Sequence, residues 1–267
     1  MKKKILLFLL PFLSLAVTVF SQDFEVSPLK LFFNAEPGES QTKFVNVKNH
    51  NSKPETFILS VSDYTINSKG QGQYVEAGSM KYSIADWISI APSFFELEPN
   101  EEKQIAVTMQ QPTDNNSSKW GVIFVRTAKE QTNFSVDKGV STGINISARI
   151  AIDVYQTPGT NKNYKANIGN MMEVTANADT VRTFSVLLNN LEDVITNCKV
   201  YLIATNIETA EETTFDAVSF VMFPKSSRKI ILTLPNGLPK GTYSLAAILD
   251  YGSKTNLEGT QMIIAVE

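Results

Sequence analysis

The chain has 267 residues, 43% of them hydrophobic, and its 24 lysines and arginines stand against 27 acids for a formal net charge of −3. The charges are spread evenly along the chain. This excludes the positively charged surface that binds nucleic acid and a polybasic patch that binds membranes. One cysteine and one histidine exclude an intramolecular disulfide and a metal site built from His and Cys ligands.

Residues 1–21 have the form of a cleaved signal peptide. Three lysines at positions 2–4 precede an apolar run from Ile5 to Phe20, and cleavage is expected after Ser21. An uncleaved membrane anchor is the alternative, whereas a lipoprotein anchor is disfavoured because Gln22, not Cys, follows the cut. No other stretch approaches the roughly 20 apolar residues of a membrane span. We therefore expect an exported protein, periplasmic or extracellular.

The first half of the exported chain is a series of short runs in which apolar and polar residues alternate, with almost no helical periodicity. Polar turns rich in Pro, Gly, Asn and Ser separate these runs, which is typical of an antiparallel sandwich. The predicted strands lie near residues 24–34, 40–49, 54–66, 87–90, 103–111, 119–128 and 142–155. The long interruption between 63 and 87 contains "KGQGQ" and is predicted to be a hairpin excursion.

The last of these strands is unusually long. Every second residue from Ile144 to Val154 is apolar, which predicts one buried face. The twelve residues 144–155 would span about 40 Å, twice the usual length of a strand. Arg149 lies in the middle of this strand.

The segment "TPGTNKN", residues 157–163, is the best candidate for a linker between two domains. It would divide the exported chain into domains at 22–156 and 164–267, each of ordinary size. Strands of the second domain are predicted near 164–176, 181–189, 195–206, 213–222, 228–234, 242–251 and 260–266. Tyr243 follows Leu238 and Gly241 at the spacing of a tyrosine corner. The predicted fold class is all-β, with two immunoglobulin-like β-sandwich domains in tandem.

Residues for catalysis are scarce. His50, the single histidine, lies in a polar turn with no nucleophile motif beside it. The glycines of "KGQGQ" do not join a strand to a helix, so they make no phosphate loop. A pair of glycosidase carboxylates stays open as an alternative. We expect no enzyme activity, no catalytic residue, no metal and no cofactor, with Trp87, Trp120 and Cys198 as core residues.

Four segments, in order, give residues 24–158 a resemblance to the periplasmic pilus-chaperone family. They are "LKLFFNAEPGESQTKFVNVKN", "WISIAPSFFELEPNEEKQIAV", "SSKWGVIFVRT" and "ISARIAIDVYQTP". The first has the basic residue and glycine-containing turn of the family's first hairpin, and the last ends in a basic-apolar-aromatic-x-x-Pro pattern. The second domain is similar only as an immunoglobulin-like unit.

The resemblance implies a chaperone or assembly factor that binds secreted or surface-fibre subunits and works with an outer-membrane pore. The long strand would be lent to a subunit that lacks one strand of its own sandwich. The residues donated would be Thr142, Ile144 and Ile146. In the alternative, these side chains face inward or pair with a neighbouring strand.

The family also holds the subunit's terminal carboxylate with two basic residues in the cleft between its domains. Lys30 matches the first of them, whereas the second falls on Ala151. Arg149, two residues earlier on the same face, could reach the same cleft and grip the carboxylate with two bonds. An ordinary exposed arginine is the alternative.

Two other functions stay open. The first is a structural or scaffolding component of a cell-envelope or secretion complex with the same fold. The second is a carbohydrate-binding sandwich, which would need a row of exposed aromatic side chains. Trp87, Trp120 and Tyr251 do not form such a row in the sequence.

Overall fold

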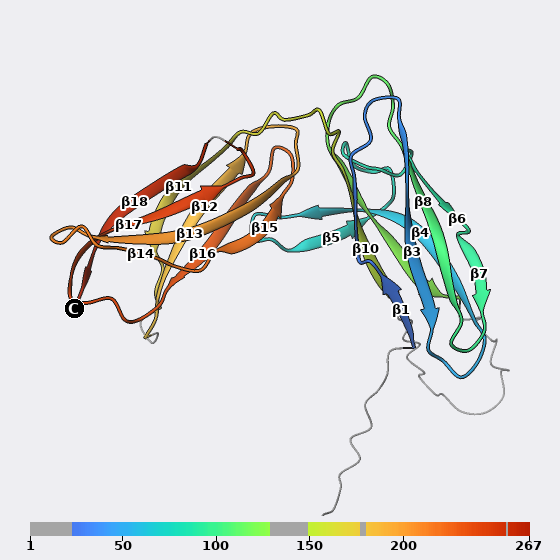
Figure 1. The fold of residues 1–267 in the computed structure, drawn as a ribbon, viewed down its shortest axis with the longest axis horizontal. Coiled ribbons are helices and arrows are strands. Elements are labelled where there is room, and N and C mark those ends of the chain that lie inside the picture. The colour runs from blue at the N-terminus through green and yellow to red at the C-terminus, as the bar shows by residue number, and fades with distance from the viewer. Residues whose placement is uncertain (1–22, 129–148, 177–179, 255) are drawn as a thin grey trace, which may run out of the picture.

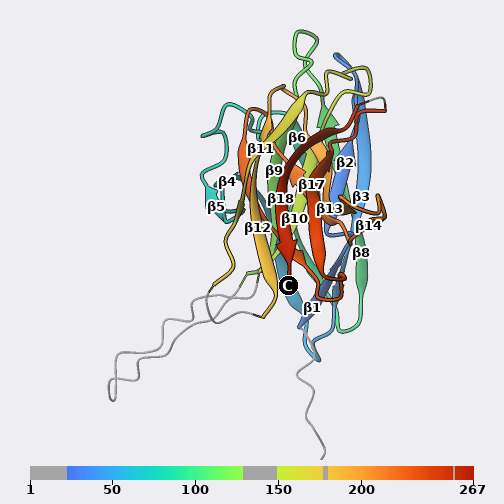
Figure 2. The same cartoon turned by 90° about the vertical axis from the view of Figure 1, so that its left-hand side faces the viewer.

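The computed structural model describes residues 23–128, 149–176, 180–254 and 256–267. Every regular element in these ranges is a β-strand. The strands form two sandwiches, which lie side by side in Figure 1 and one in front of the other in Figure 2. The predicted signal peptide, residues 1–21, lies outside the described residues.

Two sheets form the N-terminal sandwich. The first has the order β1-β3-β8-β6 and the second the order β2-β10-β9-β4-β5, with β7 also paired to β4. The strands of the first sheet are β1 (Phe24–Ser27), β3 (Ser40–Asn49), β8 (Glu102–Gln110) and β6 (Ile88–Ala91). Those of the second are β2 (Lys30–Phe33), β10 (Arg149–Gln156), β9 (Lys119–Thr127), β4 (Glu55–Ile66), β5 (Gly72–Val75) and β7 (Phe94–Leu97).

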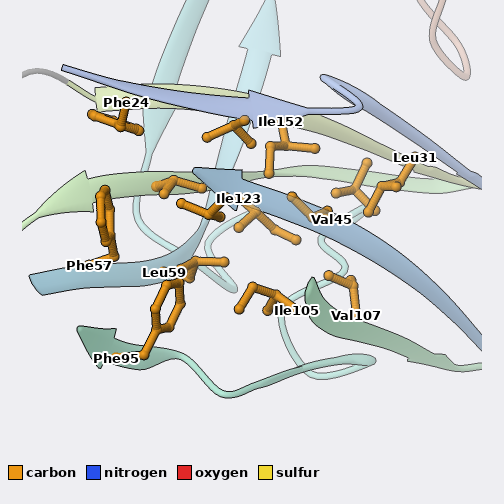
Figure 3. Close-up of a cluster of buried hydrophobic side chains, with 14 of the residues drawn as sticks. Phe24, Leu31, Val45, Phe57, Leu59, Phe95, Ile105, Val107, Ile123 and Ile152 are labelled. Atoms are coloured by element: carbon orange, nitrogen blue, oxygen red, sulfur yellow. The ribbon is translucent and has the colours of Figure 1, made fainter. Parts of the chain in front are cut away.

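The core between these sheets follows from alternation along most of the strands. Inward-facing residues of both sheets meet in one apolar cluster that includes Val45, Phe57, Ile105, Ile123 and Ile152 (Figure 3). Each of these five side chains is completely buried. β10 belongs to this core through Ile152 and Val154, with Ile150 packed beside them, as its alternating pattern predicts.

Two prolines divide the chain where one sheet gives way to the other. The single strand expected at 24–34 is split at Pro28 into β1 in the first sheet and β2 in the second. Pro92 likewise separates β6 from β7, a strand that the sequence analysis did not foresee. Proline has no N–H for a ladder, so a strand stops there and its continuation can enter another sheet. Both X-Pro bonds are cis.

The C-terminal sandwich is built from two smaller sheets. One has the order β11-β12-β16 and the other the order β14-β13-β17-β18, with β15 also paired to β13. The first contains β11 (Ala166–Glu173), β12 (Arg182–Asn190) and β16 (Ser227–Leu234). The second contains β13 (Thr196–Asn206), β14 (Glu212–Thr214), β15 (Val218–Met222), β17 (Gly241–Asp250) and β18 (Glu258–Val266).

Two residues singled out in the sequence have the expected places in this sandwich. The Tyr243 hydroxyl donates a hydrogen bond to the Pro239 carbonyl at 2.9 Å, which confirms the tyrosine corner. Cys198 is buried in the core. Burial raises the pKa of its thiol, so the neutral form is favoured.

The connection between the sandwiches is held against the first of them. Thr160 donates two hydrogen bonds to the Glu36 carboxylate, one from its N–H at 2.9 Å and one from its hydroxyl at 2.6 Å. The Asn161 side-chain amide donates to the Asn116 carbonyl at 2.6 Å. Segment 157–163 therefore follows the surface of the N-terminal sandwich.

Candidate functional site

The two halves of β10 have different neighbours. On one side β10 pairs with β9 along its whole length. On the other side it pairs with β2, but only over Asp153–Gln156. No strand of the described chain pairs with residues 149–152 on that second side. We call this stretch the open edge.

The backbone groups on the open edge can be identified from the hydrogen bonds just beyond it. The Asp153 N–H donates to the Leu29 carbonyl at 3.0 Å, and the Thr157 N–H donates to the Phe33 carbonyl at 3.1 Å. Backbone amides alternate between the two sides of a strand. The N–H and C=O groups of Arg149 and Ala151 therefore face the open edge, and those of Ile150 and Ile152 face β9.

The residues proposed for strand donation cannot be placed. Thr142, Ile144 and Ile146 lie outside the described residues. The described part of the same alternating run has Ile150, Ile152 and Val154 turned toward the sandwich core.

The two candidate carboxylate anchors lie apart. Lys30 is an exposed residue of β2 directly opposite Asp153 of β10. Arg149 is four residues before Asp153, about 13 Å along the strand. Its guanidinium carbon lies 4.3 Å from the ring centroid of Phe124 on β9 and 5.4 Å from that of Tyr74 on β5. Lys30 and the Arg149 head group therefore lie on opposite sides of β10, and the structure does not bring them together.

The outer face of the second sheet meets the C-terminal sandwich through aromatic side chains. Phe223, between β15 and β16, lies 4.4 Å from the ring centroid of Trp120 and 5.6 Å from that of Tyr64. Tyr155, in the half of β10 that β2 covers, stacks on Phe32 at 5.2 Å and on Phe223 at 6.2 Å. We call this cluster the interdomain aromatic cluster.

Trp120 is buried, as expected, but it belongs to the interdomain aromatic cluster and not to the core of either sandwich. The sequence contains a signal for burial on the outer face of β9, because "WGVIFV", residues 120–125, is apolar at every position. A strand that is buried on both faces loses its alternation. The unbroken run of β9 therefore marks a sheet that is covered on both sides.

Burial in the cluster holds its tyrosines in the neutral form. The Tyr64 hydroxyl donates to the Tyr155 oxygen at 3.3 Å, and the Tyr155 hydroxyl donates to the Asp153 carboxylate at 3.2 Å. Loss of solvent is the main reason why the pKa of Tyr155 is raised to about 12. The pKa of Tyr64 is also raised, again mainly by burial.

Hydrogen bonds connect the sandwiches at two separate places. Near the linker, the Ser118 N–H donates to the Asp193 carbonyl at 3.0 Å, and the Tyr82 hydroxyl donates to the Asp193 carboxylate at 2.9 Å. Burial, followed by this hydrogen bond, raises the pKa of Tyr82 to about 12. Farther away, the Lys229 N–H of β16 donates to the Ser68 carbonyl at 2.8 Å in the hairpin between β4 and β5. This hairpin reaches across to the C-terminal sandwich in Figure 1.

A small crevice of about 260 Å³ lies between the sandwiches beside the linker. Phe32, Tyr155 and Ile195 form part of its wall, and Lys162 is the charged residue among those that line it. Neither Lys30 nor Arg149 lines this crevice.

The described residues offer few other sites. They contain no group of three or more His, Cys, Asp and Glu side chains arranged to hold a metal ion. His50 lies at the surface, where its Nε2 atom is 3.1 Å from the Glu25 carboxylate. No helix in the described ranges is long and apolar enough to cross a bilayer.

Comparison with known proteins gives the fold. No protein-family model and no curated protein matches the chain. Among solved structures, a chain of the chaperone–tip adhesin complex of CFA/I fimbriae biogenesis is similar with a TM-score of 0.50 and 11% identity, over 91% of this chain and 98% of that one. The fold of two immunoglobulin-like sandwiches in tandem is confirmed.

Two further structures are similar over comparable lengths. The class 5 fimbriae chaperone CfaA has a TM-score of 0.47 and 11% identity, over 90% of this chain and 98% of its own. The E. coli chaperone DraB has a TM-score of 0.43 and 15% identity, over 91% of this chain and 97% of its own.

Proposed function

We propose that the chain is an exported, periplasmic chaperone or assembly factor that binds secreted or surface-fibre subunits by β-strand pairing along β10. The observation that carries this proposal is the open edge, where one side of residues 149–152 has no strand partner in the described chain. An open edge exposes unpaired backbone groups and is an aggregation hazard, so a protein that keeps one needs a use for it. The similar chain from a chaperone–tip adhesin complex supports the same function.

The backbone of β10 would supply the affinity. A partner strand would extend the second sheet by bonding to the N–H and C=O groups of Arg149 and Ala151. Pairing with β9 would hold β10 in place, and its own inward side chains would stay in the sandwich core. Thr142, Ile144 and Ile146 are the proposed donors of side chains to the partner's incomplete core.

Lys30 is the proposed anchor for the partner's terminal carboxylate. It lies opposite Asp153, where β2 begins to cover β10 and an added strand would have to end. A carboxylate at this point would meet the lysine ammonium at the surface. Arg149, proposed from the sequence as the second anchor, has its guanidinium over Phe124 and Tyr74, on the side of β10 away from Lys30.

In-cell photocrosslinking tests the proposal. A photoreactive residue at position 146 is expected to form an adduct with an exported subunit that has an incomplete sandwich. Ala151→Pro in the same chain is expected to abolish the adduct, because it removes the N–H that faces the open edge. Thermal unfolding of this variant verifies that it is folded.

Two results would overturn the proposal. An adduct with a resident envelope protein would favour a scaffold. Absence of any adduct from the folded, exported chain would mean that residue 146 meets no partner. Ile144→Asp with Ile146→Asp gives an independent test, because unchanged subunit binding would contradict strand donation.

A further inference from the structure

The hairpin between β4 and β5 crosses from the N-terminal sandwich to the C-terminal one (Figure 1). We call residues 66–72 of this hairpin the strap. The Lys229 N–H of β16 donates a hydrogen bond to the Ser68 carbonyl of the strap at 2.8 Å. In the described chain β16 is the last strand of its sheet and pairs with β12 on one side only. The strap therefore binds a backbone group on the free edge of β16.

The tip of the strap is held in shape by its own hydrogen bonds. The side-chain oxygen of Asn67 accepts from the N–H of Lys69 at 2.9 Å and from that of Gln71 at 3.1 Å. The Gly70 N–H donates to the Asn67 carbonyl at 2.9 Å. An Asn side chain that bonds to the backbone two residues on stabilises a turn locally. The shape of the tip therefore does not depend on the C-terminal sandwich.

Gly70 fits against the Arg228 head group with no room for a side chain. A Cβ atom at position 70 would lie 2.6 Å from Nη2 of Arg228 and 3.1 Å from its Cζ. Arg228 is itself held by β15, because its Nη1 donates to the Val221 carbonyl at 3.2 Å and its Cζ lies 4.8 Å from the ring centroid of Phe220. A methyl group at position 70 would have to displace an arginine that already has two partners.

A third contact lies at the base of the strap. Ile66 is partly buried and packs against the interdomain aromatic cluster, as does Val221 of β15. The strap therefore meets the C-terminal sandwich through a backbone hydrogen bond, a close fit and an apolar contact.

The strap is the second of two separate attachments between the sandwiches. The first lies near the linker, where Ser118 and Tyr82 bond to Asp193. Domains of one chain move relative to each other unless their interface prevents it. An attachment beside a linker leaves a hinge, whereas a second attachment farther away restricts rotation about it.

We propose that the strap holds the two sandwiches at one angle, and that they turn about the linker when the strap is released. Its engagement depends on Gly70, because a side chain there would push the strap away from Arg228. Release would break few contacts and leave the core of each sandwich intact, which is typical of local opening. For a partner that contacts both sandwiches, a fixed angle would lower the cost of ordering them on binding.

Gly70→Ala and Gly78→Ala form a matched pair that tests the strap in the full exported chain. The two glycines have φ values of 82° and 79°, but a Cβ atom at Gly78 would meet nothing within 4 Å. Both variants bear the same backbone cost of a positive φ, so a difference between them isolates the clash with Arg228. Thermal unfolding verifies that each variant is folded.

Two measurements report the strap and the angle separately. Hydrogen exchange at the Lys229 amide should be slow in the unmodified protein and in Gly78→Ala, and faster in Gly70→Ala. Spin labels on cysteines at the exposed positions Gln104 and Lys240 measure the distance between the sandwiches. We expect one narrow distribution of distances in the unmodified protein and in Gly78→Ala, and an additional, broader population in Gly70→Ala.

Three results would overturn the proposal. Fast exchange at Lys229 in the unmodified protein would mean that the strap is not engaged. Faster exchange at Lys229 in Gly70→Ala with unchanged distances would mean that the strap does not set the angle. Arg228→Ala removes the head group that the new methyl would meet, so in its presence Gly70→Ala should change the distances no more than Gly78→Ala does. A broader distribution that persists in that background would exclude the fit against Arg228 as the cause.

Discussion

The two halves of β10 share one strand and one set of inward side chains, yet they have different surroundings. Asp153–Gln156 is paired on both sides and backed by the interdomain aromatic cluster through Tyr155. Arg149–Ile152 is paired on one side within the described chain, and its outer face carries Arg149, whose guanidinium lies over the Phe124 ring. Stability and the proposed binding can therefore be assigned to different parts of a single strand. The covered half stabilises the fold, and in the proposed function the open half would offer backbone groups to a partner.

The largest change in stability is expected from proline substitutions at two neighbouring positions of the open half, whose N–H groups face opposite sides of β10. Ile152→Pro removes an N–H that faces β9 and empties part of the core, so we expect the free energy of unfolding to fall by about 3 kcal/mol or more. Ala151→Pro removes an N–H that faces the open edge, so its effect should be below about 1 kcal/mol. Chemical denaturation measures both. Equal losses would mean that Ala151 also bonds within the chain.

Removal of Phe223 should loosen the covered half. Phe223→Ala takes one ring from the interdomain aromatic cluster, and we expect a loss of up to about 3–5 kcal/mol, as for other buried rings. Small-angle scattering should show a wider spread of angles between the sandwiches. Leu257→Ala, an exposed position in the same domain, is the control. An unchanged scattering profile would show that the linker and hydrogen bonds alone hold the sandwiches together.

High pH should lower the free energy of unfolding through ionisation of Tyr155 in the covered half. Its pKa is raised to about 12 in the folded protein, above the value near 10 in the unfolded chain. Burial therefore favours the neutral phenol. This contribution to stability is complete below about pH 10 and is lost as the pH rises through about 12.

Tyr155→Phe should therefore reduce the fall in unfolding free energy between pH 10 and 12, by at most about 1.4 kcal/mol per pH unit. The two proteins should unfold with the same pH dependence below pH 9. Identical curves up to pH 12 would indicate that Tyr155 ionises as freely in the folded protein as in the unfolded chain.

The smallest expected effect is a gain in stability. Arg126→Gln removes one of two like charges that lie directly opposite each other beside the open half. We expect the free energy of unfolding to rise by about 0.2–1 kcal/mol, more at low salt than at high salt. A loss of stability would show that Arg126 has a partner that compensates its charge.

The sequence predicts the fold well because alternation is strong in most strands. The inward positions of β10, among them Ile152 and Val154, follow from the run that begins at Ile144. The division of 24–34 at Pro28 was not predicted, although the proline ends the ladder and the buried positions change there from Phe24 and Val26 to Leu31 and Phe33.

The site was harder to predict because it depends on pairings between distant segments. The open edge exists because β2 begins only at Lys30 and covers β10 only from Asp153. The register that places Arg126 opposite Arg149 is likewise absent from the local pattern of either strand. Phe223 lies in a turn whose partner, Trp120, is in the other sandwich.

Amide hydrogen exchange across residues 149–152 of the free, full-length exported chain tests whether the edge of β10 is open. We expect exchange rates to alternate, with slow exchange at Ile150 and Ile152, whose N–H groups face β9, and fast exchange at Arg149 and Ala151, whose N–H groups face the open edge. Slow exchange at all four amides would show that the chain itself covers this edge, and strand pairing along it would then be excluded.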